Sequence, residues 1–486
     1  MSKPKTAITP TRGEDFPEWY QQVIKAADLA ENSPVRGCMI IKPYGYAVWE
    51  NMQRIFDDMI KDLGVQNAYF PLLIPLEFIS REAQHVEGFA KECAVVTHHR
   101  LEMGLDGKLH PAPAAKLEEP FVIRPTSETI IGDAMARWVQ SYRDLPLKLN
   151  QWCNVMRWEM RTRMFLRTSE FLWQEGHNAF ETAEGAREDA LKMLDVYEDF
   201  AENTLALPVI KGEKTPEERF PGANMTYTIE AMMQDGKALQ AGTSHDLGQN
   251  FAKSIGIKFQ GRDGSEQYAH TTSWGISTRL IGAMIMAHGD DDGMIMPPRI
   301  APYHVVVIPI VRDDSDAVAL IEYSRKLKAR LKEKGVRVHI DDTDERTPNK
   351  MWSAIKKGVP IRVEIGGREM EKDGLTYIRR DIGKDSKKTV SVDEFANSIQ
   401  DILDDMHKNI FEKAKAFRDK NIVDVENLSE AEEYYKGQGE GKGFVRLDTA
   451  QINDPAFERM KRDLSLTTRC MPMTEGGRKI IIGRAY

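Results

Sequence analysis

The change of pattern at Pro297-Pro298 constrains the fold of this chain more than any other feature of its sequence. Beyond these prolines, short apolar segments alternate with amphipathic helical segments, a pattern typical of an α/β domain. The predicted strands are 304–311, 337–341, 361–365 and 375–380, and the predicted helices are 315–334 and 349–357. The sequence therefore predicts an α/β domain over residues 298–400.

Residues 1–297 have the pattern of one larger unit in which long amphipathic helices and short apolar strands are mixed. We expect helices at 48–61 and 183–206, and strands at 121–124 and 147–152. This mixture indicates a sheet flanked by helices.

A long helix is predicted from residue 392 to about residue 419, after the α/β domain. A smaller C-terminal unit is predicted over residues 401–486. It includes the second part of this helix and the glycine-rich stretch 437–443. Such a stretch is typical of a flexible loop. The fold class is therefore α/β in three units.

The composition excludes several classes of protein. A chain of 486 residues with 41% hydrophobic and 29% charged residues can bury a core and is not disordered. It has no apolar run long enough for a membrane helix and no apolar signal segment near its start. Its four cysteines (Cys38, Cys93, Cys153 and Cys470) form neither a disulfide framework nor a metal-binding knuckle. We expect a cytoplasmic enzyme without a membrane partner.

Charge is distributed unevenly along the chain. The whole chain has 67 Lys and Arg against 75 Asp and Glu, a net charge of −8, whereas residues 321–388 have 19 against 12, a net charge of +7. A basic segment of this kind is either a solvated helix face or a surface for a phosphate backbone. Charge alone leaves both interpretations open.

The stretch 154–177, NVMRWEMRTRMFLRTSEFLWQEGH, carries the clearest chemistry. Alternation predicts that Arg157 and Glu159 lie on the same face of a strand. An arginine can grip a phosphate or carboxylate with two hydrogen bonds, and a glutamate can accept from an amino group. Phe171 can stack on a flat ring, and Arg167 adds a second cation. The set suits a nucleoside triphosphate, and the alternative is a salt-bridged antiparallel hairpin.

Two further segments agree with a nucleotide site. The segment 64–73, GVQNAYFPLL, ends a long helix and enters a strand. The segment 271–282, TTSWGISTRLIG, places Gly275 and Arg279 at a strand-to-helix junction. Glycine there lets a ligand approach the backbone, and Arg279 adds a third cation. Each segment alone is also compatible with an ordinary turn.

In order along the chain, these three segments resemble motifs 1, 2 and 3 of the class II aminoacyl-tRNA synthetases. Within that class the chain resembles the prolyl-tRNA synthetases of the archaeal/eukaryotic type over nearly its whole length. The strings that carry this resemblance are KPYG (42–45), RPTSET (124–129), FLRT (165–168), LWQEGH (172–177), LQAGTSH (239–245), TSWG (272–275) and KGVPIRVEIG (357–366).

The resemblance implies a catalytic unit built on an antiparallel sheet, an α/β anticodon-binding domain and a small C-terminal α/β domain. It implies ATP and Mg²⁺ as cofactors, L-proline and tRNA(Pro) as substrates, and a homodimer with Pro71 near the subunit boundary. The enzyme would be a proline--tRNA ligase, which makes prolyl-adenylate and pyrophosphate and then transfers proline to the 3′ end of the tRNA.

The resemblance also assigns roles to residues. Arg157 would bind the α-phosphate and the amino-acid carboxylate, and Arg157 and Arg279 are the catalytic residues. The implied ATP-binding residues are Arg157, Glu159, Arg167, Thr168, Phe171, Gln240, Thr243, Ser277 and Arg279. The implied proline-binding residues are Thr126, Glu128, Arg157, Trp173, Glu175, His177, His245 and Ser273. Thr126 and Glu128 would receive the secondary amine.

The chain departs from the family pattern in three places. Only 96 residues separate Glu175 from Thr272, which leaves little room for an editing domain of about 100 residues or more. Cys470 is the only cysteine after Cys153, so a four-cysteine zinc site is excluded and no structural zinc is expected. The segment 341–357, DDTDERTPNKMWSAIKK, differs from the sequence that the family usually has there. The anticodon contacts that this segment makes in the family are therefore not expected to carry over directly. The chain ends in Tyr486, which resembles the family's terminal tyrosine, and its carboxylate is expected near the catalytic unit.

Three functions remain open on the sequence. The first is a complete synthetase. The second is a paralogue that adenylates proline or an analogue for a carrier other than tRNA, which the altered 341–357 segment motivates. The third is a non-catalytic scaffold. It predicts decay at the motif residues, and the intact Arg157, Glu159 and Arg279 oppose it.

Overall fold

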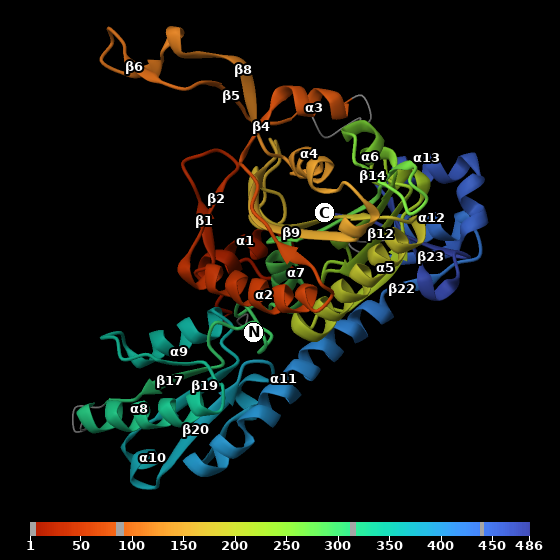
Figure 1. The fold of residues 1–486 in the computed structure, drawn as a ribbon. Coiled ribbons are helices and arrows are strands. Elements are labelled where there is room, and N and C mark those ends of the chain that lie inside the picture. Colours follow the sequence, from red (N-terminus) through yellow and green to blue (C-terminus); the bar gives the residue numbers. More distant parts are fainter. Residues whose placement is uncertain (1–5, 84–91, 312–316, 438–441) are drawn as a thin grey trace.

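The computed structural model describes residues 6–83, 92–311, 317–437 and 442–486. Most of the glycine-rich stretch predicted as a loop therefore lies outside the described residues. The structure mixes helices and sheets throughout, and its chain folds around one long central sheet with a second, smaller sheet below it (Figure 1).

The central sheet has eleven strands in the order β22-β23-β25-β24-β11-β12-β13-β16-β10-β9-β3. It is antiparallel except at the two outer pairs, β22 with β23 and β3 with β9. From the first half of the chain come β3 (Gln66–Asn67), β9 (Leu147–Met156), β10 (Glu170–Phe180), β11 (Val209–Glu213), β12 (Met225–Met232), β13 (Ala238–Gly248) and β16 (His270–Ser277).

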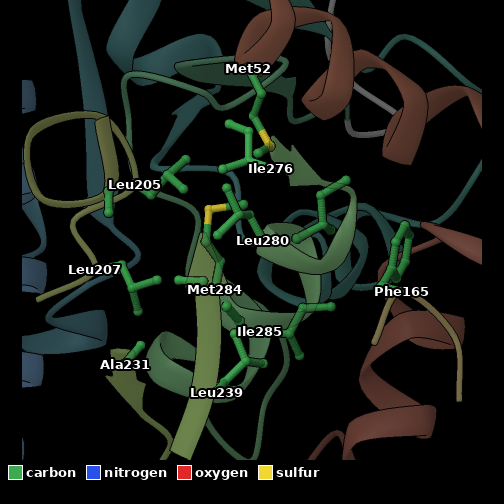
Figure 2. Close-up of a cluster of buried hydrophobic side chains, with 14 of the residues drawn as sticks. Met52, Phe165, Leu205, Leu207, Ala231, Leu239, Ile276, Leu280, Met284 and Ile285 are labelled. Carbon is green, nitrogen blue, oxygen red and sulfur yellow. The ribbon is translucent and has the colours of Figure 1, made fainter. Parts of the chain in front are cut away.

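Helices cover this part of the sheet. They are α1 (Phe16–Ala26), α2 (Pro43–Lys61), α4 (Glu128–Trp138), α5 (Ala183–Asp199), α6 (Asn250–Ile255) and α7 (Arg279–His288). Figure 2 shows Leu280, Met284 and Ile285 of α7 packed beside Ile276 of β16 and Leu239 of β13, all of them buried. Each such side chain contributes about 1.5–3 kcal/mol of burial energy. This core fixes the helix that begins at Arg279.

Smaller strands border the first unit. They are β1 (Ala30–Asn32) with β2 (Met39–Ile41), β14 (Lys258–Gln260) with β15 (Glu266–Tyr268), and β4 (Leu73–Pro75) and β5 (Val95–His98) on either side of β8 (Lys116–Ile123). The helix α3 (Leu76–Ala83) follows β4. The hairpin of β6 (Leu101–Met103) and β7 (Leu109–Pro111) projects away from the body of the molecule (Figure 1).

The second sheet has five strands in the order β18-β17-β19-β20-β21. Its first three strands are parallel and the last two antiparallel. Its elements are β17 (Val305–Pro309), α8 (Ala317–Glu333), β18 (Val338–Ile340), α9 (Thr347–Lys356), β19 (Ile361–Ile365), α10 (Gly367–Glu371), β20 (Gly374–Arg379) and β21 (Lys388–Ser391). It has its own core, which includes Val307, Val363 and Phe395.

The long helix α11 (Val392–Lys420) connects this unit to the C-terminal unit (Figure 1). Ser391 caps its start by accepting a hydrogen bond from the amide of Glu394, and two acidic residues in the first turn suit the positive end of the helix dipole. The predicted boundary at residue 400 falls inside this continuous helix.

The C-terminal unit consists of β22 (Ile422–Asp424), α12 (Leu428–Lys436), β23 (Phe444–Asp448), α13 (Pro455–Leu464), β24 (Thr467–Pro472) and β25 (Lys479–Gly483). Its sheet continues the large sheet through the pair β11 and β24, where Gly212 lies opposite Pro472. A Cβ atom on Gly212 would lie 2.6 Å from the Met471 carbonyl oxygen, so glycine allows this close approach. The unit is thereby joined to the sheet that carries the motif residues.

The helix and strand predictions for the α/β segment and the long helix are confirmed with shifts of at most two residues at the ends. Two local predictions are wrong. The α-helix expected over 183–206 ends at Asp199 and continues as a wider π-helical turn, in which the Leu205 amide donates to the Phe200 carbonyl. Arg157 and Glu159 lie beyond the end of β9, because the amide of Trp158 donates to the Glu92 carbonyl instead of to the neighbouring strand.

Within the described residues, no helix combines the length and apolar character needed to cross a membrane. In the same part of the chain, no group of three or more His, Cys, Asp or Glu side chains is placed to hold a metal ion. The four cysteines are thiols rather than members of disulfide bonds.

Candidate active site

The register of three neighbouring strands brings the motif residues together. His177 of β10 lies opposite Ser273 of β16, which lies opposite His245 of β13. Two residues along the strands, Glu175 lies opposite Gly275, which lies opposite Thr243. Residues that are about 100 positions apart in the sequence therefore share one face of the sheet.

This face is hollowed into a cavity of about 320 Å³, here called the Glu175 pocket. All eight residues expected to bind proline line it: Thr126, Glu128, Arg157, Trp173, Glu175, His177, His245 and Ser273. Lys214, Arg219 and Phe220, which the sequence did not single out, also line it.

Glu175 is the most heavily hydrogen-bonded group of the pocket. Its buried carboxylate accepts from His177 Nε2 at 2.9 Å, from the Ser127 amide at 3.0 Å and from Gln151 Nε2 at 3.2 Å. Burial alone would raise the pKa of Glu175, but these partners, His177 first, lower it to about 2. The carboxylate is therefore ionised at neutral pH and fixed in place.

The neighbouring titratable groups respond to the same environment. Burial opposes a charge on His177, yet the hydrogen bond to Glu175 raises the pKa of this histidine above its usual value. Burial together with the charge of His177 lowers the pKa of His245 to about 3, so His245 is neutral. Burial raises the pKa of Glu128. The pocket thus combines fixed charges with a neutral wall.

Arg157 lies at the edge of the Glu175 pocket. Its Nε donates to the Pro125 carbonyl at 2.9 Å, and its guanidinium carbon lies 5.2 Å from the ring centre of Trp173 and 5.6 Å from that of Phe171. Burial lowers the pKa of Arg157 to about 10, which leaves it cationic at neutral pH. The aromatic rings and the carbonyl hold this cation in one orientation.

A second cavity of about 350 Å³, here called the Glu159 cavity, lies on the other side of Arg157. Seven of the nine residues expected to bind ATP line it: Arg157, Glu159, Arg167, Thr168, Phe171, Ser277 and Arg279. The guanidinium of Arg279 donates to the Leu166 carbonyl at 3.2 Å, and Arg167 lies 3.8 Å from Glu159. The cavity therefore offers cations, carboxylate acceptors and aromatic rings.

The other two residues expected to bind ATP lie elsewhere. Thr243 and Gln240 line the Glu175 pocket, and Gln240 also lines a third cavity of about 550 Å³. We call this third space the arginine cavity, because its lining includes Arg161, Arg163, Arg167, Arg279 and Arg469. It shares Arg167 and Arg279 with the Glu159 cavity.

Some lining residues were missed by sequence reasoning. Glu92 and Trp158 line the Glu159 cavity, and Arg469 and Tyr486 of the C-terminal unit line the arginine cavity. For Glu92 and Arg469 the sequence held no signal, because both come from segments far from the motifs and reach the site through the fold. The terminal Tyr486, singled out for its resemblance, does lie beside the site.

The arrangement suits a reaction between a small zwitterion and a nucleotide. The Glu175 pocket has a volume and charges matched to an amino acid, and the Glu159 cavity matches a nucleobase with an amino group. Arg157 lines both. A fixed arginine between two such cavities can bind the carboxylate of one ligand and a phosphate of the other.

Comparison with known families agrees with this geometry. Residues 113–288 match the model described as "tRNA synthetase class II core domain (G, H, P, S and T)", and residues 304–402 match the "Anticodon binding domain". Both matches fall on units that the structure shows as separate sheets.

Curated relatives match nearly the whole chain. The chain is 57% identical to the proline--tRNA ligase of Bdellovibrio bacteriovorus over 97% of this chain and 95% of that protein. It is 52% identical to the proline--tRNA ligase of Protochlamydia amoebophila over 99% and 97%.

Solved structures agree as well. The crystal structure of prolyl-tRNA synthetase from Cryptosporidium parvum complexed with halofuginone and AMPPNP superposes with a TM-score of 0.89 at 36% identity, covering 99% of both chains. A second structure of that protein, complexed with L-proline and AMP, superposes with a TM-score of 0.87 at 35% identity, covering 99% of this chain and 97% of that chain. The chain therefore belongs to the prolyl-tRNA synthetase family of class II aminoacyl-tRNA synthetases.

Proposed function

We propose that this chain activates L-proline with ATP to prolyl-adenylate and then transfers the prolyl group to the 3′ end of tRNA(Pro). The main observation that supports this proposal is the position of Arg157, whose side chain lines both the Glu175 pocket and the Glu159 cavity. A proline carboxylate in the first and an α-phosphate at the edge of the second would meet at this guanidinium.

In the proposed reaction, proline binds in the Glu175 pocket with its secondary amine at Thr126 and Glu128. These two side chains supply a hydroxyl and a carboxylate as acceptors for the two N–H groups. Trp173, His177, His245 and Ser273 form the remaining walls, with Glu175 holding His177 in place. The volume of about 320 Å³ is ample for a small ring.

ATP binds with its base in the Glu159 cavity. Glu159 accepts from the adenine amino group, and Phe171 and Arg279 contact the two faces of the ring. Arg167, Thr168 and Ser277 hold the ribose and phosphate side, and Gln240 and Thr243 contact the nucleotide from the direction of the Glu175 pocket.

The chemical step needs no protein base. The proline carboxylate is already ionised at neutral pH, and its oxygen attacks the α-phosphorus. The bond between the α-phosphorus and the oxygen bridging to the β-phosphate breaks, and pyrophosphate leaves with the electron pair. Negative charge builds on the phosphoryl oxygens during this step. Arg157 stabilises that charge because it is fixed, cationic and largely shielded from water.

Mg²⁺ belongs to this proposal as part of the MgATP substrate. Protein sites for Mg²⁺ usually provide one or two carboxylates beside the substrate phosphates. The described residues hold no group of three metal-ligating side chains, and the lining of the arginine cavity includes no Asp or Glu from that part of the chain. Carboxylates that would accompany the metal of MgATP line the Glu159 cavity instead, namely Glu92 and Glu159.

We also propose that the chain has three domains. They are a catalytic domain over 1–297, an anticodon-binding domain over 298–400 and a C-terminal domain over 401–486. The match of residues 304–402 to an anticodon-binding family supports the second assignment. The net charge of +7 over 321–388 supports a tRNA partner for it.

A homodimer through the 64–73 segment is supported by the surface of that segment. Tyr69, Leu72 and Leu73 are exposed, with Tyr69 at 77%, and β3 forms an outer edge of the large sheet. Apolar side chains at a sheet edge are typical of an interface.

We further propose that the chain has the archaeal/eukaryotic-type layout. The named relatives from Bdellovibrio and Protochlamydia are bacterial, so their source does not indicate this type. Support comes from the layout: β11, β12 and β13, which lie in the interval between Glu175 and Thr272, belong to the central sheet, and a further unit follows α11. A cytoplasmic location agrees with four cysteines that are present as thiols rather than as disulfides.

The test is ATP–pyrophosphate exchange with each of the twenty amino acids in turn. The proposal expects exchange with proline and at least tenfold less with alanine, which lacks most of the ring that fills the Glu175 pocket. An Arg157→Gln variant that keeps its fold should lose exchange, whereas Glu170→Gln, an exposed change at the start of β10, should not. Exchange with another amino acid in preference to proline would refute the assignment.

A further inference from the structure

The arginine cavity contains more positive charge than the catalytic step just described uses. The described residues that line it include Arg161, Arg163, Arg167, Arg279 and Arg469 together with Lys237, and their lining contains no Asp or Glu side chain. Lys237 lies 3.4 Å from Asp235 and Arg167 lies 3.8 Å from Glu159, and the other four cations of the lining are all arginines. A space of about 550 Å³ with this lining is a site for a multiply charged anion.

Its position identifies the part of the reaction that it serves. It meets the Glu159 cavity at Arg167 and Arg279, and it meets the Glu175 pocket at Gln240. It therefore adjoins both cavities that converge on Arg157. A nucleotide whose α-phosphate lies at Arg157 can extend its remaining phosphates into this space.

Arg469 is the cation that the C-terminal unit contributes. Arg469 is only 7% exposed. Its Nε and one of its terminal nitrogens donate to the Glu230 carboxylate at 3.1 Å and 2.8 Å. Its other terminal nitrogen donates to Thr467 Oγ1 at 2.8 Å. These bonds take three of the five guanidinium N–H groups. These bonds hold the guanidinium group of Arg469 in one orientation. Its two remaining N–H groups are available to the cavity.

Glu230 does not cancel this charge. The same carboxylate also accepts from Lys214 Nζ at 2.9 Å and from Thr228 Oγ1 at 3.0 Å. Two cations therefore share one buried carboxylate, which leaves one positive charge in excess. The cations lower the pKa of Glu230 against the effect of burial, so the carboxylate is ionised.

The end of the chain forms another wall of the cavity. The Tyr486 amide donates to the Ala238 carbonyl, and the Ala238 amide donates to the Arg484 carbonyl, so the last residues lie along the start of β13. The Tyr486 ring lies 5.7 Å from the guanidinium carbon of Arg163 and 5.5 Å from Lys237 Nζ. The C-terminal unit thus contributes Arg469, Ala485 and Tyr486 to the wall of the cavity.

We propose that Arg469 of the C-terminal unit binds the β- and γ-phosphates of ATP and the pyrophosphate that leaves. The C-terminal unit is then part of the anion site for the leaving group, in addition to its place in the sheet. This inference rests on the proposed adenylation of proline. Arg469 contacts the leaving group only, so it distinguishes ligands that carry these phosphates from ligands that end at the α-phosphate.

The experiment compares wild type with Arg469→Gln by calorimetric titration with inorganic pyrophosphate and, separately, with AMP. We expect the variant to bind pyrophosphate at least about tenfold more weakly, the loss expected for a hydrogen-bonded charge, and to bind AMP as wild type does. The KM for pyrophosphate in ATP–pyrophosphate exchange should rise by a similar factor, with the KM for proline unchanged.

Two further variants separate binding from folding. Lys461→Gln removes a cation of the C-terminal unit that lies 3.9 Å from Glu217 and outside the three cavities, and it should leave pyrophosphate binding unchanged. Lys237→Gln removes a cation of the arginine cavity without touching Glu230, and it should weaken pyrophosphate binding as Arg469→Gln does. Arg469→Gln itself leaves Glu230 paired with Lys214, so we expect it to fold.

The inference is overturned if Arg469→Gln binds pyrophosphate within twofold of wild type. It is also overturned if AMP binding weakens by the same factor as pyrophosphate binding, which would indicate a general structural role. Pyrophosphate binding is measured without catalysis. A wild-type protein that binds pyrophosphate through Arg469 but shows no proline-dependent exchange would therefore refute the proposed function and leave this inference standing.

Discussion

Replacing Glu175 by glutamine tests the charge network of the Glu175 pocket. The pKa of this carboxylate is lowered from 4.5 to about 2 by its partners. At about 1.4 kcal/mol for each tenfold change in the dissociation constant, this depression corresponds to about 3 kcal/mol of stabilisation of the charged form. Glutamine keeps the size but loses the charge. We therefore expect Glu175→Gln to lower the free energy of unfolding by about 2–3 kcal/mol at pH 7.

The pH dependence of this loss has a defined sign. A carboxylate whose pKa is lowered on folding stabilises the protein fully above its unfolded pKa of 4.5, and the stabilisation is lost as the pH falls toward 2. Between pH 6 and pH 4 about 1 kcal/mol of the difference between wild type and variant should disappear. Urea unfolding followed by tryptophan fluorescence at both pH values measures this.

The same variant affects binding. Without the anion, the raised pKa of His177 should fall toward its usual value, and the KM for proline in the exchange assay should rise at least tenfold. Glu170→Gln on the same strand changes an exposed carboxylate that accepts from Asn154 Nδ2 at 2.8 Å, and it serves as the control. An equal loss of stability in both variants, or a loss in Glu175→Gln that does not change with pH, would refute the reasoning.

Four further predictions follow from the structure. Arg157→Lys should lower the rate of proline-dependent exchange by about a hundredfold or more with an unchanged circular dichroism spectrum, because an ammonium cannot reproduce the fork of a guanidinium. Gly212→Ala should lower the free energy of unfolding by about 1–3 kcal/mol, because its Cβ would lie 2.6 Å from the Met471 carbonyl oxygen, whereas Gly13→Ala, with open space around it, should have little effect in the same thermal melts. Leu73→Glu should shift the sedimentation coefficient of the proposed dimer toward the monomer, and an unchanged coefficient would count against this interface. Elemental analysis of the purified protein should find no stoichiometric zinc, and one zinc per chain would contradict the cysteine argument.

Much of the fold follows from local patterns in the sequence. The strand 361–365 and the long helix beginning at residue 392 are predicted correctly, because a segment in which every second residue is β-branched and a capped amphipathic run each favour one structure. The motif residues converge because the register pairs Glu175 with Gly275 and Gly275 with Thr243. The strings of residue types indicated the site, but no local pattern indicated this register.

Contacts between distant segments account for the rest. The β9 strand ends before Arg157 because the amide of Trp158 donates to the carbonyl of Glu92, a residue more than 60 positions earlier in the chain. Arg469 reaches the arginine cavity because the C-terminal sheet joins β11 through β24. Such contacts depend on the packing of whole units, and neither charge nor periodicity of the local sequence contains them.

The most direct measurement of the central claim is the charging of a tRNA(Pro) transcript with labelled proline by the purified chain in the presence of MgATP. We predict formation of prolyl-tRNA that depends on ATP and is lost in Arg157→Gln. Proline-dependent exchange without charging would contradict the claim of a complete synthetase and favour a paralogue that loads another carrier. The absence of both activities would contradict the adenylation chemistry itself.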